Sequence, residues 1–104
     1  MADFADRVRI KATEDTERLG LAGREGQVFG WTVPSSTGVT VIGEMLSDSA
    51  INVHFDDLNS SFWFSEELVE TLDHGPGTVV SLDEQDLEWV RKADGTWEQR
   101  RRSA

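Results

Sequence analysis

The stretch Gly26-Gln27-Val28-Phe29-Gly30-Trp31-Thr32-Val33 decides the fold. It is rich in β-branched and aromatic residues, and the turn sequence Pro34-Ser35-Ser36-Thr37-Gly38 ends it, which is typical of a β-strand. A glycine inside a strand, here Gly30, usually marks a bulge or a sharp bend. A small barrel needs such a bend where one strand serves two sheets. We therefore predict a bent strand, with Phe29 and Trp31 sharing a face.

Further short runs of alternating apolar and polar residues lie on both sides of this strand. In Arg7-Val8-Arg9-Ile10-Lys11, for example, Val8 and Ile10 point one way and three cations the other. Other runs cover residues 39–43, 50–55, 61–64 and 69–72. Residues 13–24 read as a long loop with room for one helical turn, and Ser65 is a good N-cap for a single turn before Leu68. The pattern predicts an all-β barrel or sandwich.

The sequence Asp73-His74-Gly75-Pro76-Gly77 breaks the pattern, so we expect a linker over residues 74–78. Beyond it, Asp94-Gly95 is a tight-turn sequence between two Trp-bearing strands. We predict a C-terminal β-hairpin over residues 79–100 that packs on the barrel, with Trp89 and Trp97 as near cross-strand neighbours. An isolated hairpin is marginal in water, so pairing with another chain and partial mobility stay open. Residues 101–104 are expected to form a disordered basic tail.

Residues 7–72 resemble an SH3-like barrel of the kind that begins with a KOW-type motif. The resemblance is carried by residues 7–10, by the Gly-x-x-Gly-x-Val-x-Gly stretch at 23–30, by 53–55 with 62–64, and by 67–70. The pattern is also similar to the barrels of two non-catalytic accessory subunits, the variable chain of ferredoxin–thioredoxin reductase and the β subunit of nitrile hydratase. The resemblance implies a five-stranded SH3-like barrel over residues 5–73.

The net charge of −10 is distributed unevenly. Residues 25–90 contain thirteen Asp or Glu and no Lys or Arg, whereas the chain ends with Arg100-Arg101-Arg102 near its terminus. KOW domains that bind RNA carry basic loops, and here everything past Arg24 in the barrel is neutral or acidic. We therefore expect no nucleic-acid binding by the barrel. The acidic charge either aids solubility or docks a basic partner.

Several kinds of chemistry are not expected. The chain has no cysteine, so it has no disulfide or thiolate site, which fits a reducing compartment. We see no stretch long enough for a signal sequence or a membrane span, and we predict a soluble cytoplasmic protein. His54 and His74 lie near aspartates without zinc-like spacing, so we predict no metal and no cofactor. No nucleophile elbow or phosphate loop is present, and we predict that the chain is not an enzyme.

Four Trp and five Phe are the most distinctive residues, and some of them must face away from the barrel core. In one interpretation the C-terminal hairpin covers these faces and forms a second small core with Trp89 and Trp97. In the other, they form an exposed aromatic patch rimmed by carboxylates, which suits a Pro-rich, Arg-containing peptide. The candidate binding residues are then Trp31, Trp63, Asp56 and Asp57.

Three functions remain open at this stage. The first is a non-catalytic protein-binding or accessory module, which the barrel pattern, the acidic charge and the Trp content favour. The second is an acidic inhibitor or nucleic-acid mimic that occupies a cationic site on another protein. The third is a regulatory subunit of a multi-subunit enzyme. The sequence leaves the partner and the oligomeric state undetermined.

Overall fold

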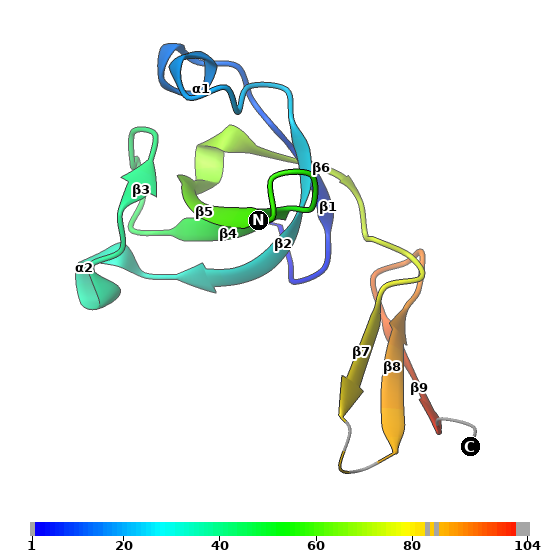
Figure 1. Cartoon of the computed structure of the whole chain (residues 1–104). Helices are drawn as coiled ribbons and strands as arrows, with labels where there is room; N and C mark the ends of the chain where they lie inside the picture. Colours follow the sequence, from blue (N-terminus) through cyan, green and yellow to red (C-terminus); the bar gives the residue numbers. More distant parts are fainter. Residues whose placement is uncertain (1, 83, 85, 102–104) are drawn as a thin grey trace.

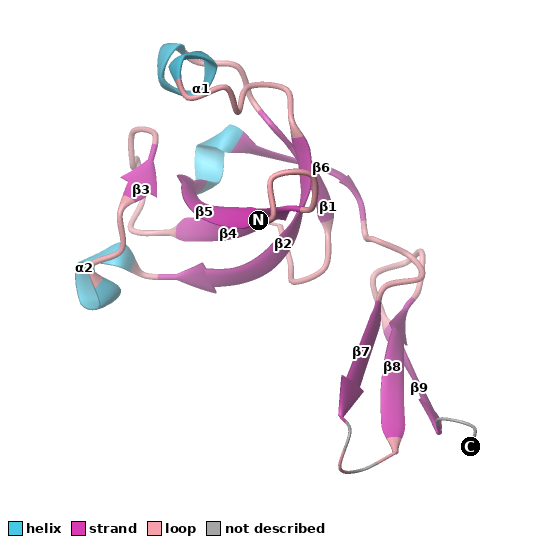
Figure 2. Ribbon diagram, viewed as in Figure 1, coloured by secondary structure: helices cyan, strands magenta, loops and turns pink. Residues whose placement is uncertain are grey.

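The computed structural model describes residues 2–82, 84 and 86–101, which form two antiparallel-rich sheets (Figure 1). The larger sheet is curled and has the strand order β3-β5-β4-β2-β1-β6, and the smaller one has the order β7-β8-β9. The elements are β1 (Arg7–Ile10), α1 (Glu14–Arg18), β2 (Glu25–Thr32), α2 (Pro34–Thr37), β3 (Val41–Ile42), β4 (Ala50–Phe55), β5 (Ser60–Ser65), the 3-10 helix η1 (Glu66–Leu68), β6 (Val69–Asp73), β7 (Val79–Leu82), β8 (Leu87–Arg91) and β9 (Trp97–Arg101). Strands dominate and the helices are single turns, so the all-β prediction is confirmed (Figure 2).

In the curled large sheet, β1 pairs with β2 on one side and with β6 on the other (Figure 1). The alternation in β1, β4 and β5 turns one face of each strand inward, and the inward side chains form one core. Phe55 and Phe64 lie at its centre with their rings edge to face, 6.0 Å apart. The buried members of the core are Val8, Ile10, Leu21, Val28, Ile51, Val53, Phe55, Phe64 and Leu68.

The predicted bend in β2 is present as a register shift between Val28 and Gly30. This bulge also determines on which face of β2 the side chains of Phe29 and Trp31 lie. Phe29 lies at the bulge and stacks on His54, with ring centroids 4.7 Å apart. Trp31 instead pairs with Ile51, a core residue. The prediction that Phe29 and Trp31 share a face is therefore wrong, because the extra residue of a bulge shifts the alternation by one position.

Two strand counts differ from the sequence prediction. The large sheet has six strands rather than five, because the two residues of β3 pair in parallel with β5. The C-terminal unit is a three-stranded sheet rather than a hairpin, because Val79–Leu82 pairs along its whole length with β8. Arg101, expected in a disordered tail, is the last residue of β9 and pairs with Leu87. The rest of that tail, residues 102–104, lies outside the described residues.

Both predicted helical turns are present. Thr13 caps α1 through a capping box with Thr16, which satisfies two backbone N–H groups that a helix leaves free. Ser65 is the N-cap of η1, as expected, but its side chain makes no capping hydrogen bond. Within the described part of the chain, no helix is long and apolar enough to cross a membrane.

The C-terminal sheet projects from one end of the curled six-stranded sheet, which we call the barrel for brevity, and this makes the molecule long (Figure 1). Its dimensions are 49 × 29 × 25 Å and its radius of gyration is 15.1 Å. A compact domain of this length would have a radius of about 13 Å. The two sheets are therefore not packed into one compact unit, and the segment that joins them forms a bend between them (Figure 1).

Candidate partner-binding surface

The four residues predicted to form a binding site are not gathered in one place. Trp31 pairs with Ile51 at the start of β4, whereas Asp56 and Asp57 follow its last residue. Five residues of strand separate the two positions by about 17 Å. Trp63 in β5 pairs with Asn52 in β4. The Trp63 side chain is half-buried and lies on the face of β5 opposite Phe62 and Phe64.

The two aspartates lie beside cationic or ionisable groups. Asp57 forms an ion pair with Arg24 at 2.7 Å, and Asp56 lies 3.3 Å from His54. They line a hollow of about 440 Å³ together with Arg7, Glu25, Gly26, Gln27, His54 and Thr78. The lining carries three carboxylates, one guanidinium and one imidazole, so its charge is mixed.

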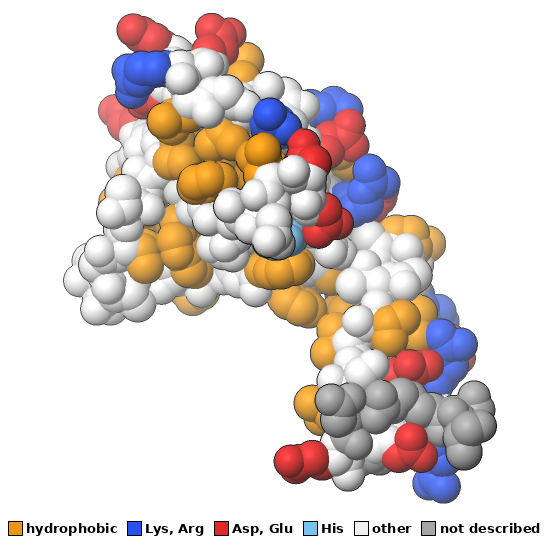
Figure 3. Space-filling model, viewed as in Figure 1, with side chains coloured by type: hydrophobic (Ala, Val, Ile, Leu, Met, Phe, Trp, Pro, Cys, Tyr) orange, Lys and Arg blue, Asp and Glu red, His pale blue; other side chains and the backbone are white. Residues whose placement is uncertain are grey.

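A different set of aromatic residues is brought together by Phe4. This residue lines one apolar hollow with Trp31, Val28 and Gly30, among others, and a second hollow with Val80, Trp89 and Trp97. Its ring stacks on Trp97 with centroids 6.0 Å apart. We call Trp31, Phe4, Trp97 and Trp89 the aromatic strip. Figure 3 shows hydrophobic side chains on the barrel, at the bend and on the C-terminal sheet.

The strip remains accessible although Phe4 stacks on Trp97. Trp31 is 51% exposed and Phe4 is 48% exposed, while Trp89 and Trp97 are half-buried. The Trp31 side chain is held in place because its Nε1 donates a hydrogen bond to Ser49 Oγ at 2.6 Å. The interpretation with a second small core around Trp89 and Trp97 is therefore met only in part: Phe4 stacks on Trp97, and both tryptophans stay half-buried.

The pairing of the C-terminal strands places the two tryptophans as predicted. Trp97 is opposite Arg91, and Trp89 is opposite Gln99. The four side chains share a face, so the two indoles are diagonal neighbours on adjacent strands. Val80 is opposite Trp89 on the third strand and adds an apolar side chain to the same face.

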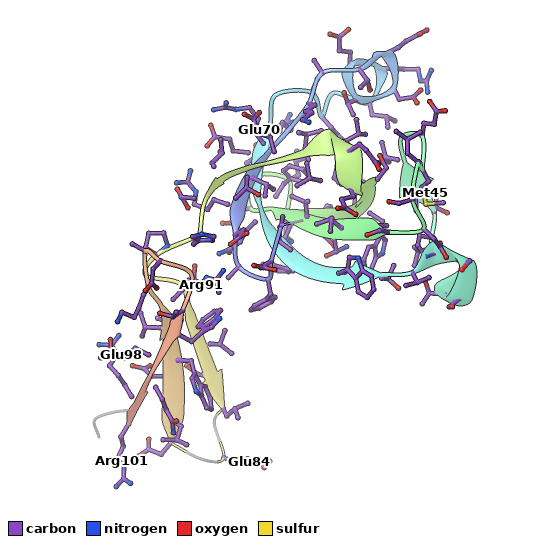
Figure 4. The ribbon with its side chains drawn as sticks, turned by 180° about the vertical axis from the view of Figure 1, so that it is seen from behind. Met45, Glu70, Glu84, Arg91, Glu98 and Arg101 are labelled. Carbon is purple, nitrogen blue, oxygen red and sulfur yellow. The ribbon has the colours of Figure 1, made fainter. Side chains whose placement is uncertain are left out.

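A buried ion pair joins the barrel to this sheet. Arg91 Nη2 donates to Asp6 Oδ1 at 2.8 Å, and both residues are buried, with exposed fractions of 5% and 2%. Arg91 Nε also donates to the backbone oxygen of His74, and its guanidinium lies 5.2 Å from the centre of the Trp97 ring. Figure 4 shows Arg91 at the end of the sheet that meets the barrel, with Glu84 and Arg101 at the far end.

Asp6 accepts more than this one hydrogen bond. His74 Nδ1 lies 2.9 Å from Oδ1, and the backbone N–H of Asp3 donates to Oδ2 at 2.9 Å. Burial alone would raise the pKa of Asp6, but the hydrogen bonds from Asp3, His74 and Arg91 outweigh it and lower the pKa below the ordinary 3.8. The charged form of Asp6 therefore fixes the N-terminal segment, and with it Phe4, against the C-terminal sheet.

Sequence reasoning missed Phe4, Asp6 and Arg91. Phe4 is an isolated aromatic residue before the first strand, and no alternating pattern surrounds it. Asp6 and Arg91 are 85 positions apart, so no local spacing links them. Among the residues that the structure describes, no group of three or more His, Asp or Glu is arranged to hold a metal ion.

Comparisons of the chain with family models, with curated proteins and with solved structures found no match.

Proposed function

We propose that the chain is a non-catalytic protein-binding or accessory module and that the aromatic strip is its binding surface. The observation that carries the proposal is the position of Phe4, which contributes to both hollows and so joins Trp31 on the barrel to Trp97 on the C-terminal sheet. Tryptophan and other aromatic side chains that are accessible but held in place are favoured at the centres of protein interfaces.

The proposed partner is a protein segment with apolar anchor side chains and basic residues beside them. Each hollow along the strip is small, at about 190 Å³ and 260 Å³, so each suits one or two side chains rather than a large organic ligand. Basic residues beside the anchors would fit Asp3, which lines the hollow that contains Trp31, and the net charge of −10. Opposite charge speeds encounter, and the apolar contacts then supply most of the affinity.

We further propose that the curled sheet belongs to the SH3-like barrels. Support comes from three features: the bulged β2, the 3-10 turn η1 directly before β6, and the pairing of β6 with β1. Such barrels host unrelated activities, so this assignment adds nothing to the binding proposal.

Affinity capture of partners from the native extract tests the proposal when it is done with matched variants. Trp31→Ala and Phe4→Ala remove aromatic groups of the strip, whereas Leu19→Ala removes an apolar side chain that is 51% exposed at the end of α1. Truncation of an interface hot spot typically costs about 2 kcal/mol or more, which weakens binding about 30-fold. We expect a specific protein to be retained by the wild type and by Leu19→Ala, and to be lost from both strip variants.

Salt separates this proposal from the acidic-mimic alternative. A complex held by apolar contacts should persist in high salt, because screening acts on exposed charges. An acidic inhibitor should instead lose its partner as salt rises and should tolerate Trp31→Ala. A partner that is retained equally by Trp31→Ala, Phe4→Ala and Leu19→Ala would refute the strip as the binding surface.

A further inference from the structure

A second hollow lies at the opposite end of the barrel from the C-terminal sheet. It has a volume of about 330 Å³ and is formed by the N-terminal turn of α1, the segment after β3, and the junction of β5 with η1. Figure 4 shows Met45, in the segment after β3, on the side of the barrel away from the C-terminal sheet. The lining residues are Thr13, Glu14, Asp15, Gly43, Glu44, Leu46, Ser65, Glu67 and Leu68.

The charge of this hollow is one-sided. Four carboxylates line it, from Glu14, Asp15, Glu44 and Glu67, and none of its described lining residues is Lys or Arg. Only Asp15 has a cationic partner close by, since its Oδ1 lies 2.8 Å from Arg18 Nη2. The other three carboxylates form no ion pair among the described residues.

Two buried oxygens in the wall point independently to a ligand. Ser65 is 1% exposed, and its Oγ has no hydrogen-bond partner among the described residues. It is the N-cap of η1 but makes no capping bond, so the hydroxyl is not used by the backbone. Glu67 Oε2 is likewise buried without a partner, while Oε1 accepts a long hydrogen bond of 3.5 Å from Ser47. Buried polar atoms are nearly always paired, and both the Ser65 hydroxyl and the Glu67 carboxylate oxygen are able to accept a hydrogen bond from a bound group.

Gly43 lies directly against the buried Ser65 hydroxyl in the wall of the hollow. A Cβ at position 43 would lie 2.7 Å from Ser65 Oγ and 2.5 Å from Leu68 Cδ1, which is closer than real contacts allow. Any side chain there would cover the hydroxyl. With glycine, the hydroxyl borders the hollow beside the apolar side chains of Leu46 and Leu68.

We propose that this hollow binds the guanidinium group of an arginine side chain. Its acceptors are charged and its walls are partly aliphatic, so it suits a cation that carries several N–H donors on an apolar stem. Arginine has five such donors, no acceptor and a long stem, and it is only weakly hydrated. The site is separate from the aromatic strip, and the proposal does not depend on the proposed function.

The test uses Nα-acetyl-arginine amide as the probe and the full chain as the receptor. The probe is titrated in low salt while the backbone amide resonances are recorded by NMR. We expect the largest shifts at Gly43, Glu44, Ser65 and Glu67. Because a hydrogen bond to a charged group contributes strongly, Glu67→Gln and Ser65→Ala should each weaken binding about tenfold. Glu66→Gln, the same charge change one residue earlier and outside the lining, should leave the affinity within about twofold.

Ser65→Ala also gives a readout that does not involve the probe. It removes a buried hydroxyl that has no partner, so the melting temperature of the free protein should rise while probe binding falls. This variant keeps the test decisive even where Glu67→Gln fails to fold.

Three outcomes would overturn the proposal. Equal shifts with Nα-acetyl-citrulline amide, which lacks the charge, would show that the cation is not recognised. Equal weakening by Glu66→Gln and Glu67→Gln would show only a diffuse acidic field. Shifts of the same amides with CaCl₂ but not with the arginine probe would assign the hollow to a metal ion instead.

Discussion

Replacement of Asp6 by Asn tests the contact that joins the two sheets. Asp6 is 2% exposed and accepts hydrogen bonds from Arg91 Nη2 and from the backbone N–H of Asp3. Asparagine keeps the shape but removes the charge, and it places an NH₂ group where one oxygen accepted. Arg91, which is 5% exposed, would then keep its buried charge without a carboxylate partner.

The expected loss of stability is about 3 kcal/mol. Removal of one partner from a buried ion pair costs about 3–5 kcal/mol, mainly because the remaining charge is left uncompensated. His74, which also contacts Asp6, has a side chain that is 41% exposed, so water can reach one side of the site. We therefore take the lower end of the range. Arg91→Met removes the charge that Asp6→Asn leaves without a partner. The loss of stability in the double variant should therefore be about 2 kcal/mol smaller than the sum of the two single losses.

Urea unfolding followed by Trp fluorescence measures these free energies. The matched control is Glu25→Gln, which neutralises a carboxylate that is 46% exposed and lies 3.1 Å from Arg7. Exposed ion pairs contribute up to about 1 kcal/mol, so the control should lose less than that. A loss below about 1 kcal/mol for Asp6→Asn, or simple additivity with Arg91→Met, would refute the reasoning.

Two further predictions concern pH and packing. The folded-state pKa of Asp6 is lowered, so its stabilising contribution is fully present above pH 3.8 and is lost as the pH falls through the folded value. Wild-type stability should therefore fall more steeply below pH 3.8 than that of Asp6→Asn, and parallel curves in acid urea titrations would contradict this. For packing, a Cβ at Gly26 would lie 2.6 Å from the His54 backbone oxygen, whereas the nearest atom at Gly30 is 4.0 Å away. Gly26→Ala should lower the free energy of unfolding by about 1–3 kcal/mol, whereas Gly30→Ala should change it by no more than about 0.5 kcal/mol, as measured by urea unfolding. Equal losses would show that the close approach of the His54 backbone is not the reason for glycine at position 26.

Local alternation predicted most of the barrel strands because it depends on burial of one strand face. Val8 and Ile10 alternate with Arg7 and Arg9, and the structure buries the first pair and exposes the second. The same alternation predicted that Ile51, Val53 and Phe55 lie on the inward face of β4, and the structure buries all three. Sequence separation does not matter for this kind of prediction, since any core on one side of the strand produces it.

The bulge shows where local alternation stops being sufficient. Gly30 predicted that β2 bends, but not on which side of the bend the alternation is shifted. Because Phe29 occupies the extra position, it stacks on His54, and Trp31 lies on the other face with Val28. A one-residue shift reverses every later side chain of a strand. The face of Trp31 therefore could not be read from spacing alone.

The candidate site was largely hidden because it is made of long-range contacts. Phe4 reaches Trp97 across 93 positions of the sequence, and Asp6 reaches Arg91 across 85. Neither contact leaves a periodic pattern in its own segment. The sequence drew attention to the tryptophans, but it could not show that an N-terminal phenylalanine connects one tryptophan to the others.

The segregation of charge along the chain does not persist in space, and this bears on where a basic partner would be attracted. Arg7 lies against both Glu25 and Asp73, and Arg24 lies against Asp57, so the acids near β1 are compensated. Among the ion pairs of the described residues none involves Glu44, Glu66 or Glu67, which lie near β3 and η1. Glu44 and Glu67 line the hollow that also includes Ser65, so no ion pair of the described residues neutralises these two carboxylates there.

Screening acts over about 8 Å at physiological salt, so this acidic end attracts a cation largely independently of the rest of the barrel. The aromatic strip has different lining residues, extends from the C-terminal sheet to Trp31, and depends on apolar contacts. Added salt should consequently weaken the arginine hollow while it leaves the strip nearly unaffected. Salt dependence measured at each site separately can then distinguish a partner that uses one of them from a partner that uses both.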